Sequence, residues 1–305
     1  MKAPLYRSLF SPLRKIINSV LISSVLLSFV VVGWRSNVLA QSPDHTVYLP
    51  LVSKNYQEWL DIFNQYRKAA GLNPVMANDS MNYGLGLHTN YMLLNPTQDD
   101  WHTEIEGKPG YTAEGKLAAS QSNMLWTTDL KYTNKQAIDL WMEYFDLNRI
   151  EKIMNHRYHM LHPKLSQSGF SLKCDQTNCF AGLNIFGGLN QFESKERIEV
   201  IFPAANQQNV PPIQYGITWG FYGDYSSELD EVTLISSKII DEKGNDIPHI
   251  SRQPVKNNVY DYVNQIALYP ERSFLPNQEY TVDITVKKNN DEIRKVWSFK
   301  TGSTP

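Results

Sequence analysis

The spacing of apolar side chains changes near the middle of this 305-residue chain. In the first part, Trp59, Phe63, Tyr66 and Ala70 follow one another at steps of three or four residues, which predicts an amphipathic helix. In the second part, apolar and polar residues alternate, as in residues 280–286, which is typical of strands with one buried face. The pattern therefore predicts an α+β chain with an all-β second part.

A second helix is expected to begin at Asp79, a residue type that commonly caps helices. Leu87, Tyr91 and Leu94 would form its apolar stripe. His88 lies beside this stripe, and we interpret it as a hydrogen-bonded core or rim residue rather than a ligand.

The sequence predicts that residues 99–128 are mainly loop, with a short strand near residues 122–126. Thr133 and Gln136 then form a capping-box pattern that predicts a third helix.

Two strand-like runs, residues 169–172 and 180–186, are joined by a polar segment that Cys174 and Cys179 bracket. We predict a disulfide at the tip of this hairpin, because two sulfurs without a second pair leave a zinc site incomplete. The helices and the hairpin together predict an α/β/α layered domain over residues 56–190. A β-sandwich is expected to follow over residues 196–303.

The first forty residues resemble a secretory signal peptide. Basic residues precede the mostly apolar residues 16–34, and Val38-Leu39-Ala40 offers small residues at a cleavage site. We predict a signal peptide over residues 1–40 and a linker over residues 41–55. The alternative is an uncleaved membrane anchor. Both readings place the bulk of the chain outside the cytoplasm, secreted or at the cell surface, where a disulfide is stable.

The net charge and the missing motifs exclude several classes of partner and activity. The net charge is −2, which gives no electrostatic basis for binding nucleic acid. The sequence lacks a Gly-x-Ser-x-Gly elbow, a His-Glu-x-x-His motif and a phosphate-binding glycine loop. Ordinary hydrolases and nucleotide enzymes are therefore disfavoured.

His102 and His156 are the strongest candidates for residues of a functional site. Two neutral imidazoles in one cleft can hold a divalent metal such as zinc, with a carboxylate or water completing the shell. Glu104 would point to the same side as His102 if that segment is extended. Alternatively, both histidines hydrogen-bond the backbone and shape a loop. His159 and His162 are expected to be structural or exposed, because steps of three residues drift around a helix.

Asn64-Gln65-Tyr66-Arg67 with Ala69-Ala70-Gly71-Leu72 would form an opening helix and turn, and residues 137–142 belong to the third expected helix. These motifs resemble the opening helix and the third helix of the CAP superfamily, which includes cysteine-rich secretory proteins, antigen 5 and plant pathogenesis-related proteins. His156-Arg157 with Ser168-Gly169-Phe170 resembles the bacterial Gly-His-Arg…Gly pattern. The resemblance covers residues 56–190 and implies that His102 and His156 are the two cleft histidines.

The chain departs from the family at both cleft acids. The first acid is replaced by Ser122, which precedes Asn123 and Met124. Glu143 lies near the second position but one residue early, which turns it by about 100° on a helix. The resemblance thus implies a cleft of His102, His156, Ser122 and Asn123, with Glu143 as a candidate acid. Glu104, which lies close to His102 in the sequence, is a candidate to replace the missing acid.

Residues 196–303 resemble the bacterial Ig-like domains that follow such modules, in Phe202-Pro203-Ala204 and in the final hairpin around Trp297. Since CAP relatives are known more for binding than for a shared reaction, the resemblance implies an extracellular binding module rather than an enzyme. Its ligand would be a lipid, a cell-wall component or a protein. The alternatives are a zinc-assisted hydrolase or peptidase that uses the two histidines, and a structural surface protein with a vestigial cleft.

Overall fold

A computed structural model describes residues 55–143, 155–193, 195–223, 231–254 and 264–303. Helices and strands are mixed in it, which confirms the α+β class. Residues 50–305 form one compact unit. The predicted signal peptide lies outside the described residues, as does the predicted linker except for Asn55.

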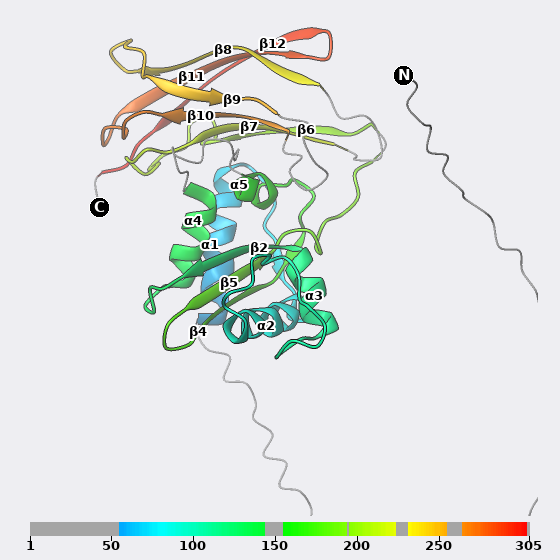
Figure 1. The fold of residues 1–305 in the computed structure, drawn as a ribbon. Helices are drawn as coiled ribbons and strands as arrows, with labels where there is room; N and C mark the ends of the chain where they lie inside the picture. The colour runs from blue at the N-terminus through cyan, green and yellow to red at the C-terminus, as the bar shows by residue number, and fades with distance from the viewer. Residues whose placement is uncertain (1–54, 144–154, 194, 224–230, 255–263, 304–305) are drawn as a thin grey trace, which may run out of the picture. The chain divides into compact units, whose positions relative to one another are not determined.

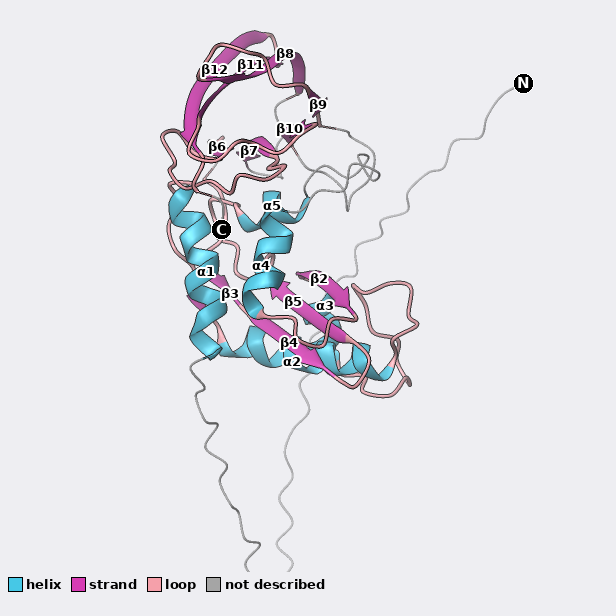
Figure 2. Cartoon of the chain, turned by 90° about the vertical axis from the view of Figure 1, so that its left-hand side faces the viewer, coloured by secondary structure: helices cyan, strands magenta, loops and turns pink. Residues whose placement is uncertain are grey.

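The first part of the chain is built in three layers (Figures 1 and 2). A three-stranded antiparallel sheet of order β2-β5-β4 lies between α2 and α3 on one side and α1, α4 and α5 on the other. A short parallel pair, β1 and β3, joins distant segments of this part. The elements are α1 (Asn55–Ala69), β1 (Met76–Ala77), α2 (Asp79–Leu94), α3 (Ala113–Ser120), β2 (Ser122–Thr127), α4 (Asn134–Glu143), α5 (Asn155–Met160), β3 (Gln167–Ser168), β4 (Phe170–Cys174) and β5 (Cys179–Asn184).

Two of the helix starts follow the sequence closely. The capping box that opens α4 is confirmed: Gln136 Oε1 accepts the Thr133 N–H, and Thr133 Oγ1 accepts the Gln136 N–H. At α2 the cap is Asn78, whose side chain accepts the Met81 N–H, so the predicted cap at Asp79 is wrong by one residue. Asp79 instead occupies the first turn, where a carboxylate also interacts favourably with the helix dipole.

The apolar stripe predicted for α2 is partly wrong, because Leu94 is exposed and Leu87 only half-buried. This helix lies between the sheet and α3, so it buries more than one face. Its buried residues include small and polar ones, which are Gly84, Leu85, His88, Thr89, Tyr91 and Met92.

The predicted disulfide is confirmed: Cys174 and Cys179 are bonded and face each other at the end of the β4–β5 hairpin. Strand β5 is buried along its whole length. On the side of α1 and α4, Trp59 stacks on Phe170, and Trp141 meets the same ring edge-on. These aromatic contacts form the core between the sheet and the helices.

Gly169 lies where the β3–β4 segment passes under the start of α2. A Cβ at this position would lie 2.5 Å from the Met81 Cβ and 2.6 Å from the Met81 carbonyl carbon. We expect Gly169→Ala to lower the free energy of unfolding by about 1–3 kcal/mol or more, because backbone must move to admit the methyl group. Urea unfolding measures the loss. Gly86→Ala is the control in the same helix–sheet layer, since its Cβ would meet only the end of the Lys173 side chain; equal losses for both variants would contradict this explanation.

The second part consists of two antiparallel sheets, of order β6-β7-β10-β9 and β12-β11-β8. Strands β7 and β10 are buried along their whole length, and both sheets contribute to one hydrophobic cluster. The Ig-like assignment of this part stays a prediction. The strands are β6 (Arg197–Phe202), β7 (Ile217–Gly223), β8 (Val232–Asp241), β9 (His249–Arg252), β10 (Gln265–Pro270), β11 (Glu279–Lys288) and β12 (Asp291–Lys300).

Helix α5 connects the two parts. The buried Arg157 donates to Met142 O of α4 and to Gly216 O, just before β7. Tyr158 stacks on Tyr222, and each of these two hydroxyls donates a hydrogen bond into the other part of the chain. His156 precedes these residues, so the element that carries it is anchored on both sides.

Candidate functional site

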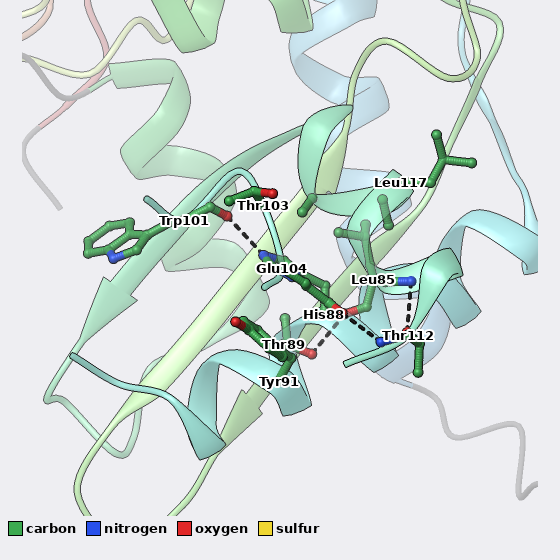
Figure 3. A network of polar contacts seen from close by, with 12 residues as sticks. Leu85, His88, Thr89, Tyr91, Trp101, Thr103, Glu104, Thr112 and Leu117 are labelled. Carbon is green, nitrogen blue, oxygen red and sulfur yellow. Dashed lines mark hydrogen bonds and ion pairs between the residues drawn. The ribbon is translucent and has the colours of Figure 1, made fainter. Parts of the chain in front are cut away.

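A buried pair, His88 and Glu104, organises the loop between α2 and α3 (Figure 3). Both side chains are inaccessible to solvent, and His88 Nδ1 lies 3.0 Å from Glu104 Oε1. His88 Nε2 lies 2.9 Å from the Trp101 carbonyl oxygen, which can only accept, so Nε2 carries a hydrogen. Glu104 Oε2 accepts the Thr112 N–H at 2.8 Å. The prediction of His88 as a hydrogen-bonded core residue is confirmed.

Other side chains fix the same loop. Gln98 Nε2 donates to the Thr103 carbonyl oxygen at 2.8 Å, and the Ile105 N–H donates to the Tyr91 hydroxyl at 3.0 Å. The backbone is thus held shortly after His102, and the His88 contact to Trp101 holds it directly before. The His102 side chain itself is exposed, with Nδ1 3.4 Å from the Ala119 carbonyl oxygen at the end of α3. The loop presents an accessible imidazole on a fixed backbone.

His156 is held against the start of β2 through a different set of contacts. Asn123 Nδ2 donates to the His156 carbonyl oxygen at 3.4 Å. The Trp141 ring meets the His156 ring edge-on, with 6.4 Å between centroids, and Trp141 Nε1 donates to the Met124 carbonyl oxygen. The His156 side chain is exposed.

The end of α3 and the start of β2 bring four of the predicted site residues to one region. The hydroxyl of Ser122 is buried and donates to the Ala118 carbonyl oxygen at 2.7 Å, next to the carbonyl that His102 faces. The neighbouring Asn123 holds His156. That the two imidazoles share one cleft stays a prediction.

The two candidate acids lie elsewhere and have partners of their own. Glu104 does not share the exposure of His102: it is 1% exposed and both of its oxygens are hydrogen-bonded within the loop. Glu143 contacts the Tyr66 hydroxyl between α1 and α4. The structure therefore gives Glu104 a structural role, since no carboxyl oxygen of Glu104 faces solvent.

The structure gives the zinc alternative no complete ligand set. Among the described residues, no three His, Cys, Asp or Glu side chains come together as a group that could hold a metal ion. His102 and His156 would need a third protein ligand to form the sites that zinc usually occupies.

Glu143 shares a proton-dependent contact with Tyr66 and Asp139. The Tyr66 hydroxyl lies 2.8 Å from Asp139 Oδ1 and 2.5 Å from Glu143 Oε1. A phenol has one hydrogen, so it can donate to only one of the two carboxyl groups. Burial raises the pKa of Glu143, against the lowering effect of the Tyr66 hydrogen bond. When Glu143 is protonated, it can donate its own hydrogen to the Tyr66 oxygen while the Tyr66 hydroxyl donates to Asp139.

The raised pKa of Glu143 predicts that the stability of the fold depends on pH. Because the pKa of Glu143 is higher in the folded than in the unfolded chain, the folded chain holds more protons, and its stability falls as pH rises above about 4.5. We expect Glu143→Gln to remove this part of the slope and to gain stability relative to the wild type towards neutral pH. Urea unfolding between pH 4 and pH 7 measures the difference, with the exposed Glu106→Gln as control. A difference between Glu143→Gln and wild type that stays constant with pH would contradict the assignment.

His159 and His162 have the structural surroundings that we expected. His162 is buried, and its Nδ1 accepts the Lys164 N–H at 3.2 Å. His159 lies edge-on to Phe186. Burial lowers the pKa of each imidazole to about 3, so both rings are neutral at physiological pH. Their titration lowers stability as pH falls from about 6.5 towards 3.

This part of the chain combines helices over a three-stranded sheet with a disulfide-bonded hairpin. It exposes one histidine from a loop and one from a short helix. The family model described as "CAP: Cysteine-rich secretory protein family" matches residues 60–187. This match supports the CAP superfamily for the first part of the chain, in agreement with the resemblance seen in the sequence. It supports, at a coarse level, an interaction module of extracellular type.

Other comparisons add little. No curated protein matches the chain. One solved structure, described as "BspA_C_mut", is 8% identical to this chain; the match covers 60% of this chain and 76% of that one, with a TM-score of 0.13. That value is too low to support an argument about fold. Within the described residues, the helices fall short of the length and apolar character needed to cross a membrane.

Proposed function

We propose that the chain is a secreted or cell-surface binding protein, in which His102 and His156 contact an extracellular ligand and the β-sheet part acts as a spacer or adhesion unit. The observation that carries this proposal is the rigid presentation of an exposed His102. Hydrogen bonds from His88, Gln98 and Glu104 hold the backbone of this loop without using the His102 imidazole. A binding site benefits from such preorganisation, because less conformational freedom is lost when the ligand binds.

His156, the second histidine of the proposed site, is also held in place by neighbouring residues. Asn123 and Trp141 position His156 from β2 and α4, while Arg157 and Tyr158 anchor the helix behind it. The replacement of the usual cleft acid by Ser122, whose hydroxyl is used within the chain, favours recognition over acid–base catalysis.

A lipid is the ligand class that we would test first, because binding of sterols and other lipids is known among CAP relatives. The full chain is titrated with dansyl-undecanoic acid and with NBD-cholesterol, and fluorescence is followed for the wild type and for His102→Gln/His156→Gln. We expect the double variant to lose at least about tenfold in affinity. His249→Gln, which changes a histidine of β9, is the matched control.

The outcomes separate the proposal from its alternatives. Binding that the double variant retains would contradict the two-histidine site. If neither lipid binds, the same variants are tested by sedimentation with purified cell-wall material. Equal sedimentation of wild type and double variant there would favour a structural surface protein with a vestigial cleft.

A further inference from the structure

A groove runs along the contact between α2 and α3, and none of the residues proposed above to contact ligand lines it. It is open to solvent and has a volume of about 600 Å³, within the usual range of ligand sites. Its walls come from the start of α2, one side of α3 and the loop after β5. Its lining residues include Asn78, Asp79, Tyr83, Glu114, Leu117 and Asn184.

The two helices meet closely at the base of this groove. A Cβ on Gly84 would lie 3.1 Å from the Ala118 Cβ, so glycine permits the close approach of α3. Two large apolar side chains, Tyr83 and Leu117, also line the groove and are 65% and 59% exposed. Single exposed apolar residues are common on protein surfaces, and two of them in one groove offer an apolar contact to an occupant.

The polar lining restricts the chemistry of an occupant. The amides of Asn78 and Asn184 are used within the chain: Asn78 holds Met81 and Gln167, and Asn184 Oδ1 accepts the Gly187 N–H. The charged groups that line the groove are the carboxylates of Asp79 and Glu114, and no Lys, Arg or His side chain is among its described lining residues. Since carboxylates only accept hydrogen bonds, a complementary ligand donates N–H groups and is best cationic.

We propose that this groove binds a short segment of a partner protein in which lysine or arginine side chains alternate with apolar side chains. A cation would face Glu114, and the apolar side chains would pack on Tyr83 and Leu117. A groove that is open to solvent accepts a chain passing through it, whereas small-molecule sites enclose most of their ligand. This inference does not depend on the histidine site, because the two share no residue.

The test is fluorescence anisotropy with a fluorescein-labelled hexapeptide of alternating lysine and leucine, at an ionic strength of about 0.15 M to screen non-specific attraction. We expect the full chain to bind it, and Glu114→Gln and Leu117→Ser each to weaken binding at least about fivefold. The matched controls change an exposed acid and an exposed leucine of the second part, in Glu279→Gln and Leu275→Ser. Both should bind like the wild type.

Two further measurements keep the result interpretable. Glu114 also lies in the first turn of α3, where a carboxylate stabilises the helix, so thermal melting must show that each variant remains folded. A peptide with glutamate in place of lysine should not bind. The proposal is overturned if the lysine–leucine peptide fails to bind at about 1 mM, or if its binding is unchanged in both groove variants. A neutral oligosaccharide that binds instead, and is lost in Leu117→Ser, would overturn the assignment of the occupant.

Discussion

Glu104→Ala is expected to lower the free energy of unfolding by about 3–5 kcal/mol, because it breaks a buried polar pair by removing one partner. The substitution leaves His88 Nδ1 without its hydrogen-bond partner and the Thr112 N–H without the oxygen that fixes the start of α3. It also opens space against Gly115, where a Cβ would lie 2.3 Å from Glu104 Oε1. Urea unfolding measures the loss, and hydrogen exchange at the Thr112 and Ile105 amides reports the loosening of the loop.

Two variants define the specificity of that effect. Glu106→Ala changes an exposed acid in the same loop and should alter stability by no more than about 0.5 kcal/mol. Glu104→Gln keeps the volume and one acceptor oxygen, so we expect a folded protein with an intermediate loss. A Glu104→Ala variant as stable as Glu106→Ala would show that the pair does not hold the loop.

Arg157→Ala should lower the free energy of unfolding by a similar amount, about 3–5 kcal/mol. It removes charge-assisted hydrogen bonds to the backbone of both parts of the chain and leaves a cavity in place of a completely buried side chain. The guanidinium also lies over the rings of Tyr215 and Phe202, at 5.1 and 5.2 Å from their centroids. The variant removes these contacts and leaves the Met142 and Gly216 carbonyl oxygens without this donor. We expect denaturant unfolding to separate into two transitions, since the two parts lose a shared anchor.

Arg157→Lys provides the graded control. Lysine keeps the positive charge but not the planar set of donors that reaches two carbonyl groups, so its loss should lie between those of wild type and Arg157→Ala. Arg272→Ala, which changes an exposed arginine, should be nearly neutral. A loss below about 1 kcal/mol for Arg157→Ala, with a single transition, would contradict the anchoring role.

The elements that can be predicted from the sequence are those whose pattern is local. The capping box at Thr133 and Gln136, the bonded cysteines and the alternating strand β11 can all be found in this way. Helix α3 is not predicted: it has eight residues, and its start depends on the Thr112 cap and on the distant Glu104. Strands β7 and β10 are buried on both faces and therefore carry no alternation.

The two histidines of the candidate site can be picked out in the sequence, but the residues that hold the backbone around them cannot. His88 and Glu104 are separated by 16 residues of helix and loop, and no spacing rule pairs them. The prediction that Glu104 lies beside His102 assumes an extended segment, whereas the folded loop turns His102 outward and Glu104 inward. The position of Glu143 beside Tyr66 likewise depends on how α1 packs on α4.

The most direct test of the proposed site needs no ligand. The imidazole C–H resonances of His102 are recorded by NMR in the wild type, in His156→Gln and in His249→Gln. If His102 and His156 form one binding surface, His156→Gln shifts the His102 resonances and changes their titration with pH, while His249→Gln leaves them in place. His102 resonances that are identical in all three proteins would show that the two histidines do not share a cleft, and would contradict the proposed function.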